Sequence, residues 1–86
     1  MNNAVPVLTL DHAVIGSIYH IVAVRDALAE RAERLADLGF LPGESASVLA
    51  RGQPGNEPLA VRVGLSTFAL RRAEAACVVV SPVELR

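Results

Sequence analysis

The chain contains no lysine and no tryptophan, and its only aromatic residues are Tyr19, Phe40 and Phe68. Eight arginines are set against nine acidic residues, so the formal net charge is −1. Nucleic-acid-binding domains of this size usually have a basic excess or a platform of stacking aromatic side chains. We therefore expect no nucleic-acid partner, and an RNA-binding barrel of the ribosomal type is a disfavoured alternative.

The single cysteine and the short apolar runs exclude further classes. Cys77 has no partner cysteine, so the chain has neither an internal disulfide nor a cysteine-based zinc site. The most apolar stretch, residues 13–24, is interrupted by Gly16 and His20 and is shorter than the ~20 residues of a membrane-spanning helix. The N-terminus also lacks the pattern of a secretion signal. We expect a cytoplasmic protein that does not insert directly into the membrane.

Recognisable catalytic motifs are missing as well. The chain has no nucleophile elbow and no phosphate-binding loop, and no nucleophile is paired with a base at a familiar spacing. We predict that the protein is not an enzyme and requires no cofactor.

The residues that are abundant favour strands. Twelve valines and eleven leucines supply the core of an 86-residue chain, and β-branched side chains suit a pleated, half-buried surface. Alternation of apolar and polar residues and the positions of turn residues predict five short strands. Four lie at residues 17–25, 45–51, 59–63 and 77–81, and another contains Phe68 and Leu70, after a tight turn near residues 64–66.

One helix is predicted between the first two strands, from Asp26 to Leu38. Leu28, Ala32 and Leu35 share one helical face, with Leu38 at its edge, and Gly39 suits the left-handed residue that ends a helix. The residues Pro42 and Gly43 then predict a turn. Glu30 precedes Arg34 by four residues, the favourable order for an ion pair within a helix.

These elements predict the fold class. Five short strands, one inserted helix and a helical turn at residues 72–76 suit a mainly β, SH3-like barrel, because closure removes exposed sheet edges. A single helical turn is also expected at residues 10–12, after Thr9. We expect a flexible N-terminus at residues 1–8, the barrel at 9–82 and a C-terminal tail at 83–86.

Candidate metal ligands are few. Asp11, His12 and His20 are the residues that suit a weak site for a divalent transition metal, if a second chain adds further ligands. The plainer interpretation is that both histidines face solvent. Four acidic residues that share the polar helical face form either a solvated surface, a docking surface for a basic partner or a loose cation site: Asp26, Glu30, Glu33 and Asp37.

The first strand offers a candidate interaction surface. If Tyr19, Ile21 and Val24 point inward, with a bulge before Val24, then Ile18 and Val22 point outward beside His20. Burial under the inserted helix is the more ordinary expectation for these two aliphatic side chains. Contact with another chain is the alternative.

The run from Arg34 to Gly43 resembles the signature of the FeoA family, small cytoplasmic proteins of bacterial ferrous iron uptake. Arginine and leucine near a helix end are followed by an acidic residue, Leu-Gly, two apolar residues and Pro-Gly. Further matches follow in family order: Leu8-Thr9-Leu10, Gly16, Arg51 and Pro58 around a loop, Val61-Arg62-Val63, Phe68 to Arg72, Glu74-Ala75-Ala76 and Val78 to Val80.

The resemblance implies an SH3-like barrel that binds the cytoplasmic part of the FeoB membrane iron transporter and modulates transport. It also implies a location at the inner face of the membrane, where the partner lies. Arg34, Phe40 and Leu41, together with Ile18 and Val22, are the candidate partner contacts. A module that binds a divalent metal and forms a homodimer in response is the alternative function.

Overall fold

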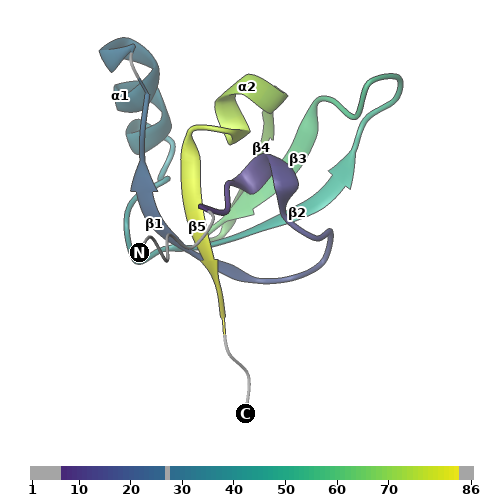
Figure 1. The fold of residues 1–86 in the computed structure, drawn as a ribbon, viewed down its shortest axis with the longest axis horizontal. Helices are drawn as coiled ribbons and strands as arrows, with labels where there is room; N and C mark the ends of the chain where they lie inside the picture. The colour runs from purple at the N-terminus through teal and green to yellow at the C-terminus, as the bar shows by residue number, and fades with distance from the viewer. Residues whose placement is uncertain (1–6, 27, 84–86) are drawn as a thin grey trace, which may run out of the picture.

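The computed structural model describes residues 7–26 and 28–83, and the strands among them form a single antiparallel sheet. The sheet has the strand order β4-β3-β2-β1-β5, and it curves around one core (Figure 1). Strands β2 to β4 follow one another as a meander, whereas β1 lies between β2 and β5. The strands are β1 (Tyr19–Val24), β2 (Ser45–Arg51), β3 (Leu59–Val63), β4 (Ser66–Leu70) and β5 (Val78–Pro82). The predicted mainly β fold with five short strands is confirmed.

Residues 7–26 and 28–83 include three short helical elements. The 3-10 helix η1 (Leu10–His12) precedes β1, α1 (Ala29–Asp37) joins β1 to β2, and α2 (Arg72–Ala75) joins β4 to β5. Figure 1 shows α1 and α2 at the same end of the sheet. None of the helices within the described ranges has the length and apolar character needed to cross a membrane.

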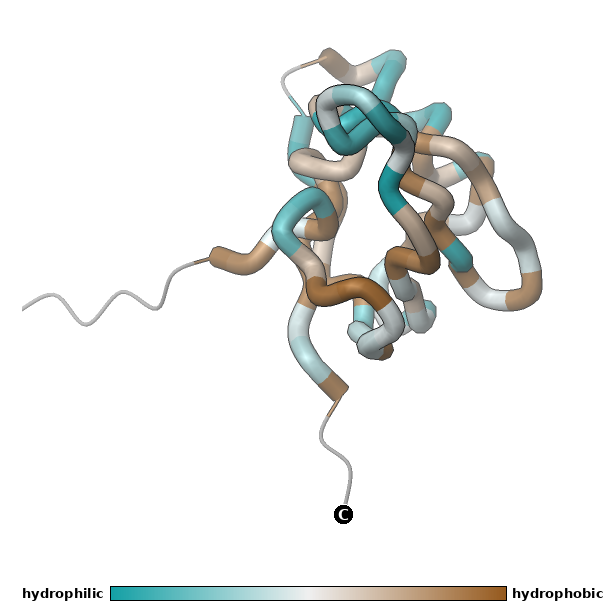
Figure 2. The backbone as a smooth tube through the Cα atoms, turned by 90° about the vertical axis from the view of Figure 1, so that its right-hand side faces the viewer, coloured by the Kyte–Doolittle hydropathy of each residue, from teal (hydrophilic) through white to brown (hydrophobic). Residues whose placement is uncertain are grey.

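The core follows from the alternation along the strands. In β3, Leu59, Val61 and Val63 are buried while Arg62 between them is exposed, as expected for successive side chains on opposite faces. The largest fully buried side chains come from nearly every element: Phe40, Leu10, Leu35, Leu59, Leu70, Val48, Val61 and Val78. Most hydrophilic stretches lie at the end that carries α1 and α2 (Figure 2).

The end of α1 and the following turn match the sequence. Gly39 has a φ of 109° directly after the helix, where a left-handed residue ends it. The turn then closes with a hydrogen bond of 3.0 Å from the N–H of Glu44 to the carbonyl of Leu41. Gly43 has a φ of 92° at the turn position that disfavours a side chain. The predicted Pro42-Gly43 turn is therefore confirmed.

The start of α1 differs from the prediction. The helix begins at Ala29 and not at Asp26, because Leu28 has an extended backbone (φ −97°, ψ 106°). The carboxylate of Asp26 accepts a 2.8 Å hydrogen bond from the N–H of Leu28 in the segment before the helix. Leu28 is consequently out of phase with Leu35, and its side chain is 57% exposed while Leu35 is buried. Its assignment to the apolar helical face was wrong.

The N-terminal segment covers part of the outer edge of β5. The N–H of Val80 donates to the carbonyl of Leu8 over 2.9 Å, and Thr9 forms an isolated bridge with Val79. Leu8 also packs against the core. Of the expected flexible N-terminus, residues 1–6 lie outside the described residues, as do residues 84–86 of the expected tail.

Candidate docking surface

The outer side of β1 carries two exposed aliphatic side chains. Ile18, just before the strand, is 54% exposed, and Val22 within it is 50% exposed. His20 between them is also exposed. A register shift in the pairing with β5, between Ile21 and Ala23, places the predicted bulge at this position. Burial under the inserted helix was wrong, because α1 directs Leu35 into the core and leaves these side chains uncovered.

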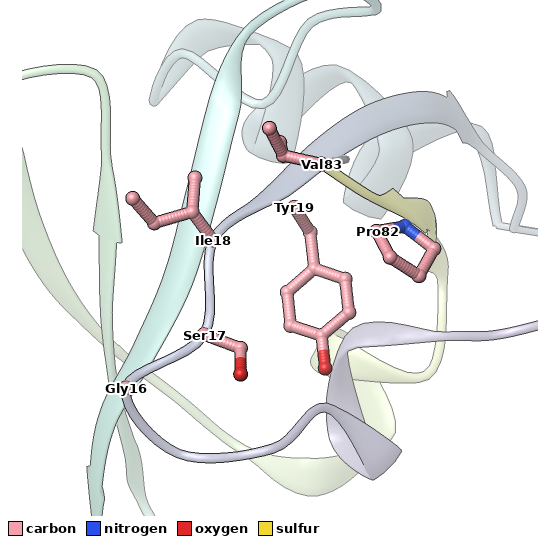
Figure 3. Close-up of a pocket in the computed structure, with 6 residues that line it drawn as sticks. All are labelled: Gly16, Ser17, Ile18, Tyr19, Pro82 and Val83. Atoms are coloured by element: carbon pink, nitrogen blue, oxygen red, sulfur yellow. The ribbon is translucent and has the colours of Figure 1, made fainter. Parts of the chain in front are cut away.

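A hollow of about 350 Å³ lies beside Ile18 (Figure 3). The Tyr19 ring forms one of its walls (Figure 3), and the phenolic oxygen of Tyr19 accepts a 2.9 Å hydrogen bond from the N–H of Val14. The N–H of Val83 donates to the carbonyl of Ile18 over 3.2 Å, which joins the two walls. The lining is mainly apolar: Gly16, Ser17, Ile18, Tyr19, Pro82 and Val83.

A second, more open hollow of about 430 Å³ lies between β1, α1 and the segment after Gly39. Glu33 is its only charged lining residue. Leu41 stands at this hollow with 47% of its surface exposed. The remaining lining residues are small or apolar: Ala23, Val24, Ala32, Ala36, Phe40 and Pro42.

Phe40 does not provide an exposed contact. It is fully buried, and its ring centroid lies 6.3 Å from that of Phe68. The backbone reversal at Gly39 directs Phe40 into the core, so the next residue, Leu41, is left at the surface. The prediction of Phe40 as a partner contact was wrong.

Hydrogen bonds fix the segment of Leu41 against β1. The N–H of Gly43 donates to the carbonyl of Ile21, and the N–H of Ile21 donates to the carbonyl of Glu44, both over 2.8 Å. Leu41 therefore lies on a segment that is held at the middle of β1, the strand that carries Val22. We call Ile18, Val22 and Leu41 the β1 surface.

Arg34 is exposed but already paired. Its guanidinium forms an ion pair with Glu74 of α2, although 62% of the Arg34 side chain remains exposed. The predicted ion pair between Glu30 and Arg34 was wrong, because Arg34 pairs instead with Glu74 from another helix. Glu74 also accepts a 2.9 Å hydrogen bond from the N–H of Arg71. Glu74 lies three residues after Arg71, as in a helix capping pattern, and this spacing is the signal that could have identified Glu74 as a structural acid.

A polar cluster that the sequence did not reveal joins the start of α1 to Cys77, the residue before β5. The Sγ of Cys77 donates to Asp26 over 3.2 Å, and the Nε of Arg31 lies 3.2 Å from the same carboxylate oxygen. The hydrogen bond from the N–H of Leu28 is the main cause that lowers the pKa of Asp26, against the opposing effect of burial. Burial, followed by the hydrogen bond to Asp26, raises the pKa of Cys77. Asp26 therefore does not belong to the solvated acidic face.

The candidate metal ligands are only partly brought together. The Nε2 of His12 lies 3.4 Å from the Oδ2 of Asp11, and 78% of the His12 side chain is exposed. His20 is on β1, away from this pair. Across residues 7–26 and 28–83, no group of three or more His, Cys, Asp or Glu side chains could hold an ion. Zinc sites take three or four protein ligands, so these residues do not form such a site within one chain.

The strand order, with the first strand between the second and the last, and the helical turn before β5 define an SH3-like barrel. This is a class of small domains whose surfaces can serve as binding sites. A family model described as the FeoA domain matches residues 8–82. The chain belongs to the FeoA family.

Solved structures agree with this assignment. A Stenotrophomonas maltophilia FeoA in complex with zinc, described as a prokaryotic SH3 domain protein, is 41% identical; the match covers 86% of this chain and 89% of that one, with a TM-score of 0.77. A Chlorobium tepidum FeoA is 28% identical over 90% of this chain and 71% of its own, with a TM-score of 0.76. A search of the curated proteins found no match.

Metal-dependent repressors share the fold. A manganese-dependent transcriptional repressor is 20% identical over 93% of this chain and 44% of its own, with a TM-score of 0.80. At this identity, the similarity concerns the architecture alone.

Proposed function

We propose that the protein is a non-catalytic accessory protein of bacterial ferrous iron uptake that binds the cytoplasmic part of a FeoB-like transporter and modulates transport. The observation that carries the proposal is the match to the FeoA domain over residues 8–82. The similar Stenotrophomonas protein is suggested to act as a bacterial ferrous iron transport activating factor. Such a role places the protein in the cytoplasm, at the inner face of the membrane when it is bound to its partner.

The β1 surface is the docking surface that the geometry supports best. Ile18, Val22 and Leu41 are each about half exposed, and two mainly apolar hollows lie along the same strand. Aliphatic side chains that are exposed beside preformed hollows can bury apolar area on binding without unfolding the core. Arg34 is a further contact, because most of its side chain stays exposed while it is paired with Glu74.

Calorimetric titration of the chain with the transporter's cytoplasmic domain, with and without guanine nucleotide and Fe²⁺, tests the proposal. The variant Leu41→Glu should weaken binding by about tenfold or more, because a buried apolar contact is replaced by a charge that loses its water. Leu65→Glu is the matched control: Leu65 is 93% exposed, on the turn between β3 and β4.

One result would contradict the proposed partner, and another would contradict the proposed docking surface. Absence of binding by the parent chain under all conditions would remove the FeoB-like partner. Equal binding by the Leu41→Glu and parent chains would retain the partner and remove the β1 surface.

A metal-responsive homodimer is the second candidate function. It is favoured by the zinc complex of the Stenotrophomonas relative and by the proximity of Asp11 and His12 in this chain. Because two side chains do not complete a site, a second copy would have to supply the other ligands. His20 lies away from this pair and would act only through a contact between copies.

Sedimentation with and without Zn²⁺ or Fe²⁺ tests this second function. The mass should double when the metal is added to the parent chain and should not change for a chain with His12→Ala and His20→Ala. A parent chain whose mass stays that of a monomer in both metals would exclude ion-driven dimerisation.

A further inference from the structure

A polar hollow on another side of the molecule has no role in the docking proposal. It has a volume of about 350 Å³ and lies where η1, the end of β2, the following loop and α2 meet. Its lining consists of Asp11, His12, Arg51, Asn56 and Arg72. Asp11 and His12, which the sequence suggested as metal ligands, therefore share their hollow with two guanidinium groups. The positive charges of these groups oppose the binding of a metal ion within one chain.

Each of the two arginines contacts one backbone carbonyl through its guanidinium group. Arg51 donates from one terminal nitrogen to the carbonyl of Ala13 over 3.0 Å, and Arg72 donates from one terminal nitrogen to the carbonyl of Gly55 over 3.5 Å. A guanidinium has five N–H donors and no acceptor. The other nitrogens of these two groups have no hydrogen-bond partner among the described residues, so most of their donors remain available.

Several acceptors around the hollow already have partners. One carboxylate oxygen of Asp11 accepts from the hydroxyl of Thr9, and the other faces His12 at 3.4 Å. Glu57, in the adjoining loop, accepts a 2.9 Å hydrogen bond from the N–H of Arg72. The two guanidinium groups therefore hold most of the unpaired hydrogen-bonding capacity of the lining, and a group rich in acceptors would complement their donors.

We propose that this hollow binds a phosphate-type oxyanion. The donors come from β2, from the loop and from α2, so an occupant must accept from several directions. A tetrahedral phosphate has oxygens for both guanidinium groups and for the Asn56 amide, whereas a planar carboxylate has two oxygens that one arginine can satisfy. The Asp11 carboxylate opposes the anion and keeps the site weak.

Nuclear magnetic resonance titration of the full chain tests the site, with inorganic phosphate, glycerol 3-phosphate and acetate at equal ionic strength. Saturable shifts should appear at the Asn56 side-chain amide and at the Nε–H groups of Arg51 and Arg72. They should appear with the phosphate or its ester and not with acetate; the tighter of the two identifies free phosphate or a phosphate ester as the source. Absence of saturation with both phosphate compounds, or equal shifts with acetate, would overturn the proposal.

Four variants make the assignment specific. Arg72→Gln should weaken binding about tenfold, the effect of one charge-assisted hydrogen bond. Arg62→Gln on the exposed side of β3 should leave it unchanged. Asn56→Gly should also weaken binding. Because Asn56 has a φ of 60°, glycine can keep the loop conformation, so this variant tests the site even if Arg72→Gln is unstable.

Asp11→Asn distinguishes an anion site from a metal site most directly. Removing the negative charge should tighten phosphate binding, whereas a metal site would lose its ligand and bind Zn²⁺ more weakly. Weaker phosphate binding by Asp11→Asn, or equal losses in Arg62→Gln and Arg72→Gln, would refute the anion site. Failure of the transporter to bind would not affect it, because the β1 surface and this hollow share no residue.

Discussion

Arg34 of α1 and Glu74 of α2 form an ion pair that joins the two helices. The two side chains are unequal: Glu74 is 11% exposed, whereas Arg34 is 62% exposed. Glu74 also accepts from the N–H of Arg71 at the start of α2. One carboxylate therefore both begins the second helix and attaches the first one to it.

Glu74→Gln should lower the free energy of unfolding by about 1 kcal/mol, because the amide retains an acceptor for Arg71 but loses the charge facing a partly solvated Arg34. Urea unfolding measures the change. Glu30→Gln, at an exposed position of α1, should change it by less than about 0.5 kcal/mol. Equal effects of the two substitutions would show that the pair does not stabilise the fold.

Asp26→Asn should make stability less dependent on acid pH. The pKa of Asp26 is lowered in the folded chain, chiefly by the Leu28 N–H, so its charge stabilises the fold above the unfolded pKa of ~3.9. That contribution is lost as the pH falls through the folded pKa. Unfolding measured from pH 7 to pH 2 should therefore decline less steeply below about pH 4 in the variant, since asparagine does not titrate. A variant curve parallel to the parent curve would contradict this assignment.

Cys77 should react slowly with thiol reagents. Only 9% of the residue is exposed, burial raises the pKa of its thiol, and the reactive species is the thiolate. At pH 8, labelling should be at least on the order of tenfold slower than at an exposed cysteine introduced by Ser66→Cys in a Cys77→Ala background. The labelling rate of Cys77 should rise with urea in parallel with unfolding. Labelling at the rate of the exposed control in the absence of urea would show that the cluster with Asp26 and Arg31 opens freely.

Shortening Phe40 should destabilise the fold far more than shortening Leu41. Phe40→Ala should lower the free energy of unfolding by about 3–5 kcal/mol, because it leaves a cavity beside Phe68. Leu41→Ala should change it by less than about 1 kcal/mol, since nearly half of its surface is already in water. Thermal or urea unfolding of the two variants distinguishes these roles, and similar losses would contradict the assignment of Leu41 to the surface.

The features that could be predicted from the sequence depend on local chemistry. The alternation of Leu59, Val61 and Val63 fixes which face of β3 is buried, because the period of a strand is two. Gly39 and Gly43 mark the end of α1 and the next turn, because both need a positive φ. Resemblance added the family, which composition alone could not provide.

The features that could not be predicted depend on contacts between distant segments. Helical spacing makes Glu30 the natural partner of Arg34, yet Glu74 reaches the same guanidinium from α2. The inward direction of Phe40 follows from the path of the chain after Gly39, and adjacent apolar residues do not show which one is buried. Arg51 and Arg72 share a hollow with Asp11 only in the folded chain, so nothing in the sequence indicated the two guanidinium groups beside the candidate cation ligands.

The position of β1 between β2 and β5 has a consequence for the order of folding. The meander of β2, β3 and β4 joins neighbours in the chain, whereas Tyr19 pairs with Pro82 near the other end of the described residues. Closing long loops is slower than forming local hairpins. We expect the meander to form early and the pairing of β1 with β5 to form late. The β1 surface would then be completed in the final step, so partly folded chains would not compete for its partner.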